Sequence, residues 1–226
     1  MQTADVQIPS DDLLLDGTLT VPDAARGIVV FAHGSGSSRL SPRNRDVASV
    51  LDNAGLATLL FDLLSAEEYR QDLFSAEYRF DIPLLARRLG GALDWVRSHA
   101  VLSSLPVGVF GASTGAAAAL SAAARDDTVR AVVSRGGRPD LAREALELVK
   151  APTLLIVGEM DNEVVRLNQF AAEQFTCEHR IEIVPGATHL FEEPGALEQV
   201  AQLAAQWFVK WLASGERGAP EGPRQE

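Results

Sequence analysis

A serine at the centre of residues 111–115, which read GASTG, is the first candidate for chemistry in this chain. Residues 107–110 before it form a short apolar run typical of a buried strand, and the alanine-rich segment after it has strong helix propensity. A G-x-S-x-G turn between a strand and a helix is the context of a nucleophile elbow, which exposes the serine hydroxyl. The pattern therefore predicts that Ser113 is a nucleophile, with an ordinary helix N-cap as the structural alternative.

A serine hydroxyl is a weak nucleophile until a base takes its proton and an acid orients that base. Of the four histidines, His33 ends an expected strand, His99 ends an expected helix and His179 begins a strand. His189 lies between the last expected strand and the last expected helix. Only this place gives the chain order nucleophile, acid, histidine, so we expect His189 to be the base.

Two carboxylates are candidates for the orienting acid, because both follow the strand expected at 153–157. Glu159 and Asp161 lie in one short loop, GEMDN at 158–162. Asp161 also has a structural interpretation as the N-cap of the next helix. The residues by themselves keep both carboxylates as candidates.

Acyl transfer also requires hydrogen-bond donors for a developing oxyanion. The backbone N–H of Thr114, directly after the nucleophile, is one expected donor. The second is expected from the loop HGSGSS at 33–38, with Ser35 preferred and Gly34 as the alternative. A phosphate-binding loop is the competing interpretation, but the chain lacks both G-x-x-x-x-G-K-[ST] and G-x-G-x-x-G.

Strands alternate with helices after an N-terminal hairpin, which predicts a mostly parallel α/β sheet with helices on both faces. Strands are expected at 5–8, 13–21, 27–32, 56–61, 107–110, 129–134, 153–157 and 180–184. Helices are expected at 42–54, 82–99, 141–150, 164–175 and 195–213, with a short helix at the capping-box residues Ser65 and Glu68. Ligands of such sheets bind beyond the carboxyl ends of the strands, where all the candidate residues are expected to meet.

Composition sets limits on the class of protein. The length of 226 residues suits a single α/β domain at 1–213, and the polar segment 214–226 is expected to be disordered. The net charge of −11 argues against a nucleic-acid partner. A single cysteine, Cys177, favours a reducing compartment. Because no signal peptide or membrane-spanning pattern is found, we expect a cytoplasmic protein without a membrane partner.

Four motifs together resemble the α/β-hydrolase family, in particular small lidless members similar to dienelactone hydrolase. They are HGSGSS at 33–38, GASTG at 111–115, GEMDNEV at 158–164 and GATHLF at 186–191. The resemblance runs from residue 6 to residue 212. It implies an eight-stranded sheet without a large cap domain and a triad of Ser113, His189 and Asp161 that hydrolyses an ester, lactone or related acyl bond. It also favours Asp161 over Glu159.

The expected ligand is a small-molecule acyl substrate, and no metal-binding cluster or cofactor motif is present in the sequence. Dienelactone hydrolases use cysteine where this chain has Ser113. This difference is compatible with acyl chemistry, but the resemblance then no longer implies dienelactone as the substrate. Gly34, Arg135 and Arg138 are expected substrate contacts, the two arginines toward an anionic substrate, with a solvated loop at 134–138 as the alternative. Acyltransferase, thioesterase or lyase activity on the same scaffold, or binding without catalysis by a relic triad, are the alternative functions. The sequence does not indicate an oligomeric state.

Overall fold

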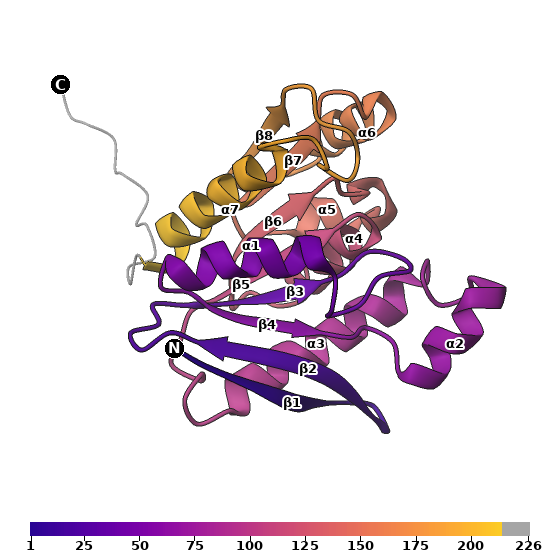
Figure 1. The fold of residues 1–226 in the computed structure, drawn as a ribbon. Coiled ribbons are helices and arrows are strands. Elements are labelled where there is room, and N and C mark those ends of the chain that lie inside the picture. Colours follow the sequence, from indigo (N-terminus) through magenta and orange to yellow (C-terminus); the bar gives the residue numbers. More distant parts are fainter. Residues whose placement is uncertain (214–226) are drawn as a thin grey trace.

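An eight-stranded sheet forms the centre of the computed structural model, which describes residues 1–213 (Figure 1). The strand order is β1-β2-β4-β3-β5-β6-β7-β8. β2 pairs antiparallel with both β1 and β4, and all the other pairs are parallel. The strands are β1 (Gln2–Ser10), β2 (Leu13–Val21), β3 (Ile28–Ala32), β4 (Ala57–Phe61), β5 (Val107–Ala112), β6 (Val129–Arg135), β7 (Thr153–Gly158) and β8 (His179–Val184). The expected mostly parallel, eight-stranded sheet is confirmed.

Helices cover both faces of this sheet (Figure 1). They are α1 (Pro42–Asn53), α2 (Ala66–Ser75), α3 (Ile82–Ser98), α4 (Thr114–Ala123), the 3-10 helix η1 (Pro139–Ala142), α5 (Ala145–Leu148), α6 (Asn162–Ala172) and α7 (Ala196–Ala213). The Ser41 side chain caps α1 by accepting from the N–H of Asn44, and Pro42 stands at the first helical position. This is the arrangement that places proline where no N–H is needed.

The core consists of two apolar clusters, one on each face of the sheet. Because successive side chains of a strand point to opposite faces, Val30 of β3 joins the cluster beneath α3 and α4, whereas Val29 and Phe31 join the cluster beneath α1 and α7. Every residue of β3 and of β4 is buried. Burial on both faces is characteristic of the central strands of a parallel sheet. It holds these strands in place, and the candidate residues follow the carboxyl ends of such strands.

The hairpin and one helix differ from the expectation. β1 is longer than the expected 5–8, because its polar outer residues pair with β2 from Gln2 to Ser10. A turn of two residues joins the strands, with Asp11 at a φ of 51°. The helix expected at 141–150 is broken into η1 and α5, since Arg143 between them has a φ of 51°.

One element leaves the layered arrangement. α2 stands out to one side of the sheet (Figure 1), and its N-terminus has the expected capping box between Ser65 and Glu68. No cap domain covers the sheet within residues 1–213. No helix in that region is long and apolar enough to cross a membrane. The expectation of disorder at 214–226 concerns residues outside those described.

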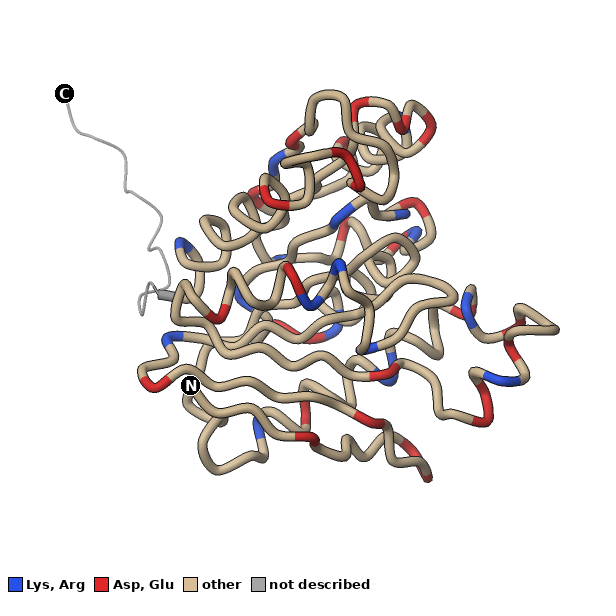
Figure 2. Tube along the Cα trace, viewed as in Figure 1, with Lys and Arg blue, Asp and Glu red and all other residues tan. Residues whose placement is uncertain are grey.

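The charged residues are distributed over the whole described trace. Figure 2 shows Lys and Arg interspersed with Asp and Glu rather than gathered on one face.

Candidate active site

Ser113 lies on the sharp turn between β5 and α4, with φ 51° and ψ −120°. A non-glycine residue at positive φ is strained by about 1 kcal/mol or more and persists only where its surroundings fix it. The Ser113 N–H donates to the carbonyl of Arg135, and its own carbonyl accepts from the N–H of Arg138, both at 3.1 Å. The Ser113 side chain makes no capping hydrogen bond to α4. The N-cap alternative therefore does not describe this serine.

The two glycines of the motif are required by close packing of backbone on backbone. A Cβ at Gly111 would lie 2.4 Å from the Cα of Ala116. A Cβ at Gly115 would lie 2.2 Å from the carbonyl oxygen of Ala32. Any side chain at either position would force α4 away from β3 and β5, so both glycines hold the turn against the sheet.

His189 and Asp161 meet across two loops at the same edge of the sheet. Nδ1 of His189 lies 2.6 Å from Oδ2 of Asp161. Asp161 makes no side-chain capping bond to α6, so its carboxylate is directed to the histidine. The competing Glu159 instead accepts a hydrogen bond from the Gly186 N–H at 2.7 Å. The structure therefore pairs Asp161, and not Glu159, with the imidazole.

The end of β6 links His189 to the serine turn. The Cβ position of Gly136 lies 3.6 Å from Cε1 of His189, so the imidazole ring lies within van der Waals distance of this residue. The residue before it, Arg135, accepts the hydrogen bond of Ser113 through its carbonyl. Serine, histidine and aspartate thus occupy one region beyond the carboxyl ends of β5, β7 and β8.

The loop 33–38 lies directly against the serine. A Cβ at Gly34 would lie 3.1 Å from the Cβ of Ser113. Gly34, Ser35 and Thr114 line one small hollow of about 10 Å³. Within residues 1–213 no group accepts a hydrogen bond from the Ser35 N–H, and Thr114 begins a helix, where N–H groups lack intrahelical partners. The structure therefore brings together the two expected oxyanion donors.

Sequence reasoning assigned no role to His33, which anchors this loop. Its Nε2 accepts from the Leu63 N–H at 3.0 Å, so the proton resides on Nδ1, which donates to the Gly34 carbonyl at 3.0 Å. Burial lowers the pKa of His33 and favours this neutral form, against opposing effects of the Gly34 bond and of Asp62. A histidine directly before the glycines was the signal available in the sequence.

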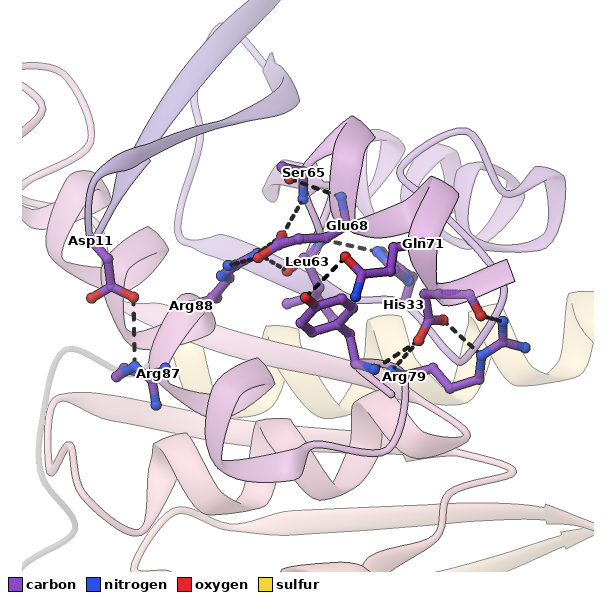
Figure 3. Close-up of polar contacts among 11 residues, drawn as sticks. Asp11, His33, Leu63, Ser65, Glu68, Gln71, Arg79, Arg87 and Arg88 are labelled. Atoms are coloured by element: carbon purple, nitrogen blue, oxygen red, sulfur yellow. Dashed lines mark hydrogen bonds and ion pairs between the residues drawn. The ribbon is translucent and has the colours of Figure 1, made fainter. Parts of the chain in front are cut away.

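A further set of contacts fixes the segment that His33 holds (Figure 3). Arg88 of α3 donates to the carbonyl of Leu63 at 3.0 Å and to both carboxylate oxygens of Glu68 at 2.6 Å. Glu68 is also the capping-box residue of α2. Arg88 therefore ties the start of α2 to the loop that supports the expected oxyanion donors.

Two arginines, the last residue of β6 and one three residues later, lie in different environments. Arg138 binds Asp140 through Nε and Nη2, at 2.9 and 2.8 Å, and this pairing raises its pKa. Arg135 is buried at the end of β6. The two arginines have the same expected role as substrate contacts in the sequence, but in the structure one is paired with a carboxylate and the other is buried.

Two larger hollows lie on the surface. One of about 400 Å³ adjoins the loop 33–38 and is lined by His33, Leu64 and Tyr69, among others. The other, of about 840 Å³, lies between the β1 end and α3, near Trp95. Neither hollow is lined by Ser113, Asp161 or His189, but the first shares His33, Ser37, Leu64 and Tyr69 with the small hollow that Ser35 and Thr114 line. Within residues 1–213, no cluster of three or more His, Cys, Asp or Glu side chains is arranged to hold a metal ion.

Comparisons with known proteins found one matching family model and several similar structures. The model of the dienelactone hydrolase family matches residues 15–214. A crystal structure of dienelactone hydrolase from Anabaena variabilis is 58% identical, with a TM-score of 0.92 over 93% of this chain and 98% of that one. The structure of Est1E from Butyrivibrio proteoclasticus is 16% identical, with a TM-score of 0.78 over 93% of this chain and 99% of that one, and this likeness concerns the fold alone.

A longer relative comes from Mycobacterium tuberculosis and is named "Putative phosphoribosyl transferase". It is 57% identical over 213 residues, which are 94% of this chain but 47% of that protein. The chain therefore spans about half the length of this relative, whose name refers to the whole.

Proposed function

The chain belongs to the dienelactone hydrolase family, and we propose that it is a serine hydrolase that cleaves a small ester, lactone or related acyl bond through an acyl-enzyme. The observation that carries this proposal is the strained Ser113, without a capping bond, at the same sheet edge as the 2.6 Å contact between His189 and Asp161. Strain of this kind at an uncapped serine is typical of a nucleophile elbow.

In the proposed reaction, the Ser113 oxygen attacks the carbonyl carbon while Nε2 of His189 takes the hydroxyl proton. Asp161 accepts the hydrogen bond from Nδ1 and so keeps Nε2 free to act as the base. The backbone N–H groups of Ser35 and Thr114 stabilise the oxyanion of the tetrahedral intermediate.

The intermediate collapses when the bond to the leaving group breaks, and His189 returns its proton to that group. Water then attacks the acyl-enzyme, with His189 again as the base, and the serine hydroxyl is regenerated together with a carboxylic acid. No cofactor is needed for either half of the reaction. The small-molecule substrate would enter from the hollow beside the loop 33–38.

The alternatives differ in the acceptor or in the bond that is cleaved. An acyltransferase would use an alcohol or amine instead of water, a thioesterase would act on a thioester, and a lyase would use the same scaffold differently. A non-catalytic binding protein with a relic triad is less compatible with a free serine oxygen and a paired histidine. The name of the Mycobacterium tuberculosis relative concerns a protein of twice the length and favours none of these.

The test is turnover of p-nitrophenyl esters, lactones and thioesters by the wild-type chain and by Ser113→Ala. We expect the variant to lose on the order of 10⁴ to 10⁶ in rate and to keep its melting temperature. Ser103→Ala, at an exposed serine, is the matched control and should behave as the wild type. Near wild-type turnover by Ser113→Ala would overturn the proposal.

A further inference from the structure

The peptide unit between Gly34 and Ser35 is held at its carbonyl oxygen. This oxygen accepts two hydrogen bonds, from Nδ1 of His33 at 3.0 Å and from the Ser37 N–H at 3.2 Å. A trans peptide unit is planar, so its carbonyl and its N–H point in opposite directions. Fixing the Gly34 carbonyl therefore also fixes the direction of the Ser35 N–H, which is the expected oxyanion donor.

His33 can hold that carbonyl only in one tautomer, and Leu63 selects it. The Leu63 N–H donates to Nε2 of His33 at 3.0 Å, and a donor at this nitrogen places the ring proton on Nδ1. Both residues are buried, so the bond is sheltered from competing water. The position of the Leu63 backbone therefore sets the tautomer and the orientation of the His33 ring.

Leu63 is held in turn by Arg88 of α3, whose side chain is 3% exposed. Nη1 of Arg88 donates to the Leu63 carbonyl at 3.0 Å, and Nη1 and Nη2 donate to the two carboxylate oxygens of Glu68, each at 2.6 Å. Figure 3 shows Arg88 between these two partners. One guanidinium thus fixes the Leu63 backbone and the first turn of α2 together.

The pair of Arg88 and Glu68 is better suited to precise positioning than to stability. Burial of Glu68 opposes its ionisation, but hydrogen bonds from Arg88 and Ser65 outweigh this effect and lower its pKa. Removing two charges from water costs about as much as their attraction returns, so a buried ion pair adds little net stability. A bidentate contact between a guanidinium and a carboxylate does, however, define a single geometry.

We propose that Arg88 is a positioning residue of the oxyanion hole. Held by Glu68, it fixes Leu63, which through His33 sets the direction of the Ser35 N–H. Arg88 touches no reacting atom in this scheme, and it acts only through the chain of hydrogen bonds that ends at the Gly34 carbonyl. This inference rests on the proposed function, because an oxyanion hole has a role only where an acyl group is transferred.

The first experiment measures kcat/KM for p-nitrophenyl butyrate. Arg88→Met should lower it about 10- to 100-fold, because a small displacement of a catalytic donor is costly. Arg87→Met is the matched control, since Arg87 is the next residue of α3 and pairs at 3.6 Å with the exposed Asp11, outside this chain of hydrogen bonds (Figure 3). The control should retain the wild-type value.

The second experiment separates positioning from stability by inhibition with propylboronic acid, which forms a tetrahedral adduct with a nucleophilic serine. Because the adduct resembles the tetrahedral intermediate, its inhibition constant should rise in Arg88→Met by the factor by which kcat/KM falls. Loss of folded protein alone would lower the rate and leave the inhibition constant unchanged.

A conservative variant covers the case in which Arg88→Met does not fold. Arg88→Lys keeps the charge but not the planar fork that binds Glu68 and Leu63 together. We expect its kcat/KM to lie below the wild-type value and its inhibition constant to lie above it. Hydrogen exchange of Ser113→Ala provides a readout without turnover, and adding Arg88→Lys should accelerate exchange in residues 33–38 but not in α7.

The possible failures are distinguishable. A wild type that hydrolyses no acyl substrate overturns the proposed function and this inference with it. An active wild type whose kcat/KM is affected equally by Arg88→Met and Arg87→Met overturns the inference alone. The same holds if kcat/KM falls while the inhibition constant stays at the wild-type value, or if Arg88→Lys leaves turnover, inhibition and exchange unchanged.

Discussion

The carboxylate of Asp161 lies 2.6 Å from Nδ1 of His189, whereas the carboxylate of Glu159, two residues earlier, accepts a hydrogen bond from the Gly186 N–H at 2.7 Å. The two acids lie in one loop, yet they bind different partners. A contact at this distance orients an imidazole and stabilises its protonated form. Because only Asp161 contacts the histidine, substitutions of the two acids should affect turnover differently.

Asp161→Asn should reduce kcat/KM for p-nitrophenyl acetate about 10⁴-fold, because an amide favours the wrong tautomer of the histidine. Glu159→Gln should reduce it less than about tenfold, since it changes only a bond to the backbone. Steady-state kinetics of both variants provide the measurement. The opposite ranking would transfer the acid role to Glu159.

Gly115→Ala should unfold or severely weaken the protein, by about 3–5 kcal/mol, because its Cβ would lie 2.2 Å from the Ala32 carbonyl oxygen. Gly90 of α3 is the matched control, since a Cβ there meets no atom within 4 Å. Gly90→Ala should stabilise the helix by about 0.5–1 kcal/mol. Urea unfolding measures both changes, and equal effects of the two substitutions would contradict the close packing of the turn.

Asp52→Asn should stabilise the protein at pH 8 but not at pH 4. Burial is the main cause that raises the pKa of Asp52 from 3.8 to about 6, against an opposing hydrogen bond from Thr58. A carboxyl with a raised folded-state pKa favours the fold below its unfolded value and loses that contribution as the pH rises through about 6. The full shift corresponds to about 3 kcal/mol, which solvent screening of a half-buried group reduces to about 1 kcal/mol.

Thermal unfolding at the two pH values measures this difference, and about 1 kcal/mol corresponds to about 2–4 °C for a protein of this size. Asp46→Asn is the matched control, because it removes the same charge from an exposed position of the same helix. Equal shifts at pH 4 and pH 8 in Asp52→Asn would contradict the assignment.

Esters of short acids, from acetate to butyrate, should be the best neutral substrates. The hollow lined by Ser35 and Thr114 holds only about 10 Å³, so few methylene groups can be buried there, each worth about 0.8 kcal/mol. A series of p-nitrophenyl esters of increasing acyl length tests this expectation. A maximum of kcat/KM at octanoate or longer would show that an apolar tunnel opens at the site.

The sequence predicted the features of the fold and the site that depend on local order. The sequence predicts Ser113 as the nucleophile because strand, turn and helix follow one another within a short segment, and the structure has this order. His189 is the predicted base because it follows the last strand, whose carboxyl end must lie at the edge where ligands bind. The strands of the sheet and the capping box at Ser65 and Glu68 were predicted for the same reason.

Contacts between distant segments were beyond such reasoning. Asp161 and Glu159 are distinguished by their contacts with a distant loop, to which the Met160 N–H between them also donates, at the Ala187 carbonyl. Arg135 differs from Arg138 because β6 continues one residue further than the expected 129–134, and this residue then projects onto a buried face. The role of His33 depends on Leu63, 30 positions away in the chain.

The most direct test of the account is covalent labelling with a fluorophosphonate, followed by intact-mass analysis and peptide mapping. Such a probe reacts with a serine that an adjacent base activates, so it reports the nucleophile without any assumption about the substrate. The account predicts one adduct per chain on Ser113, none in Ser113→Ala, and markedly slower labelling in Asp161→Asn. A folded wild-type protein that remains unlabelled at Ser113, or that carries the adduct on another residue, would contradict it.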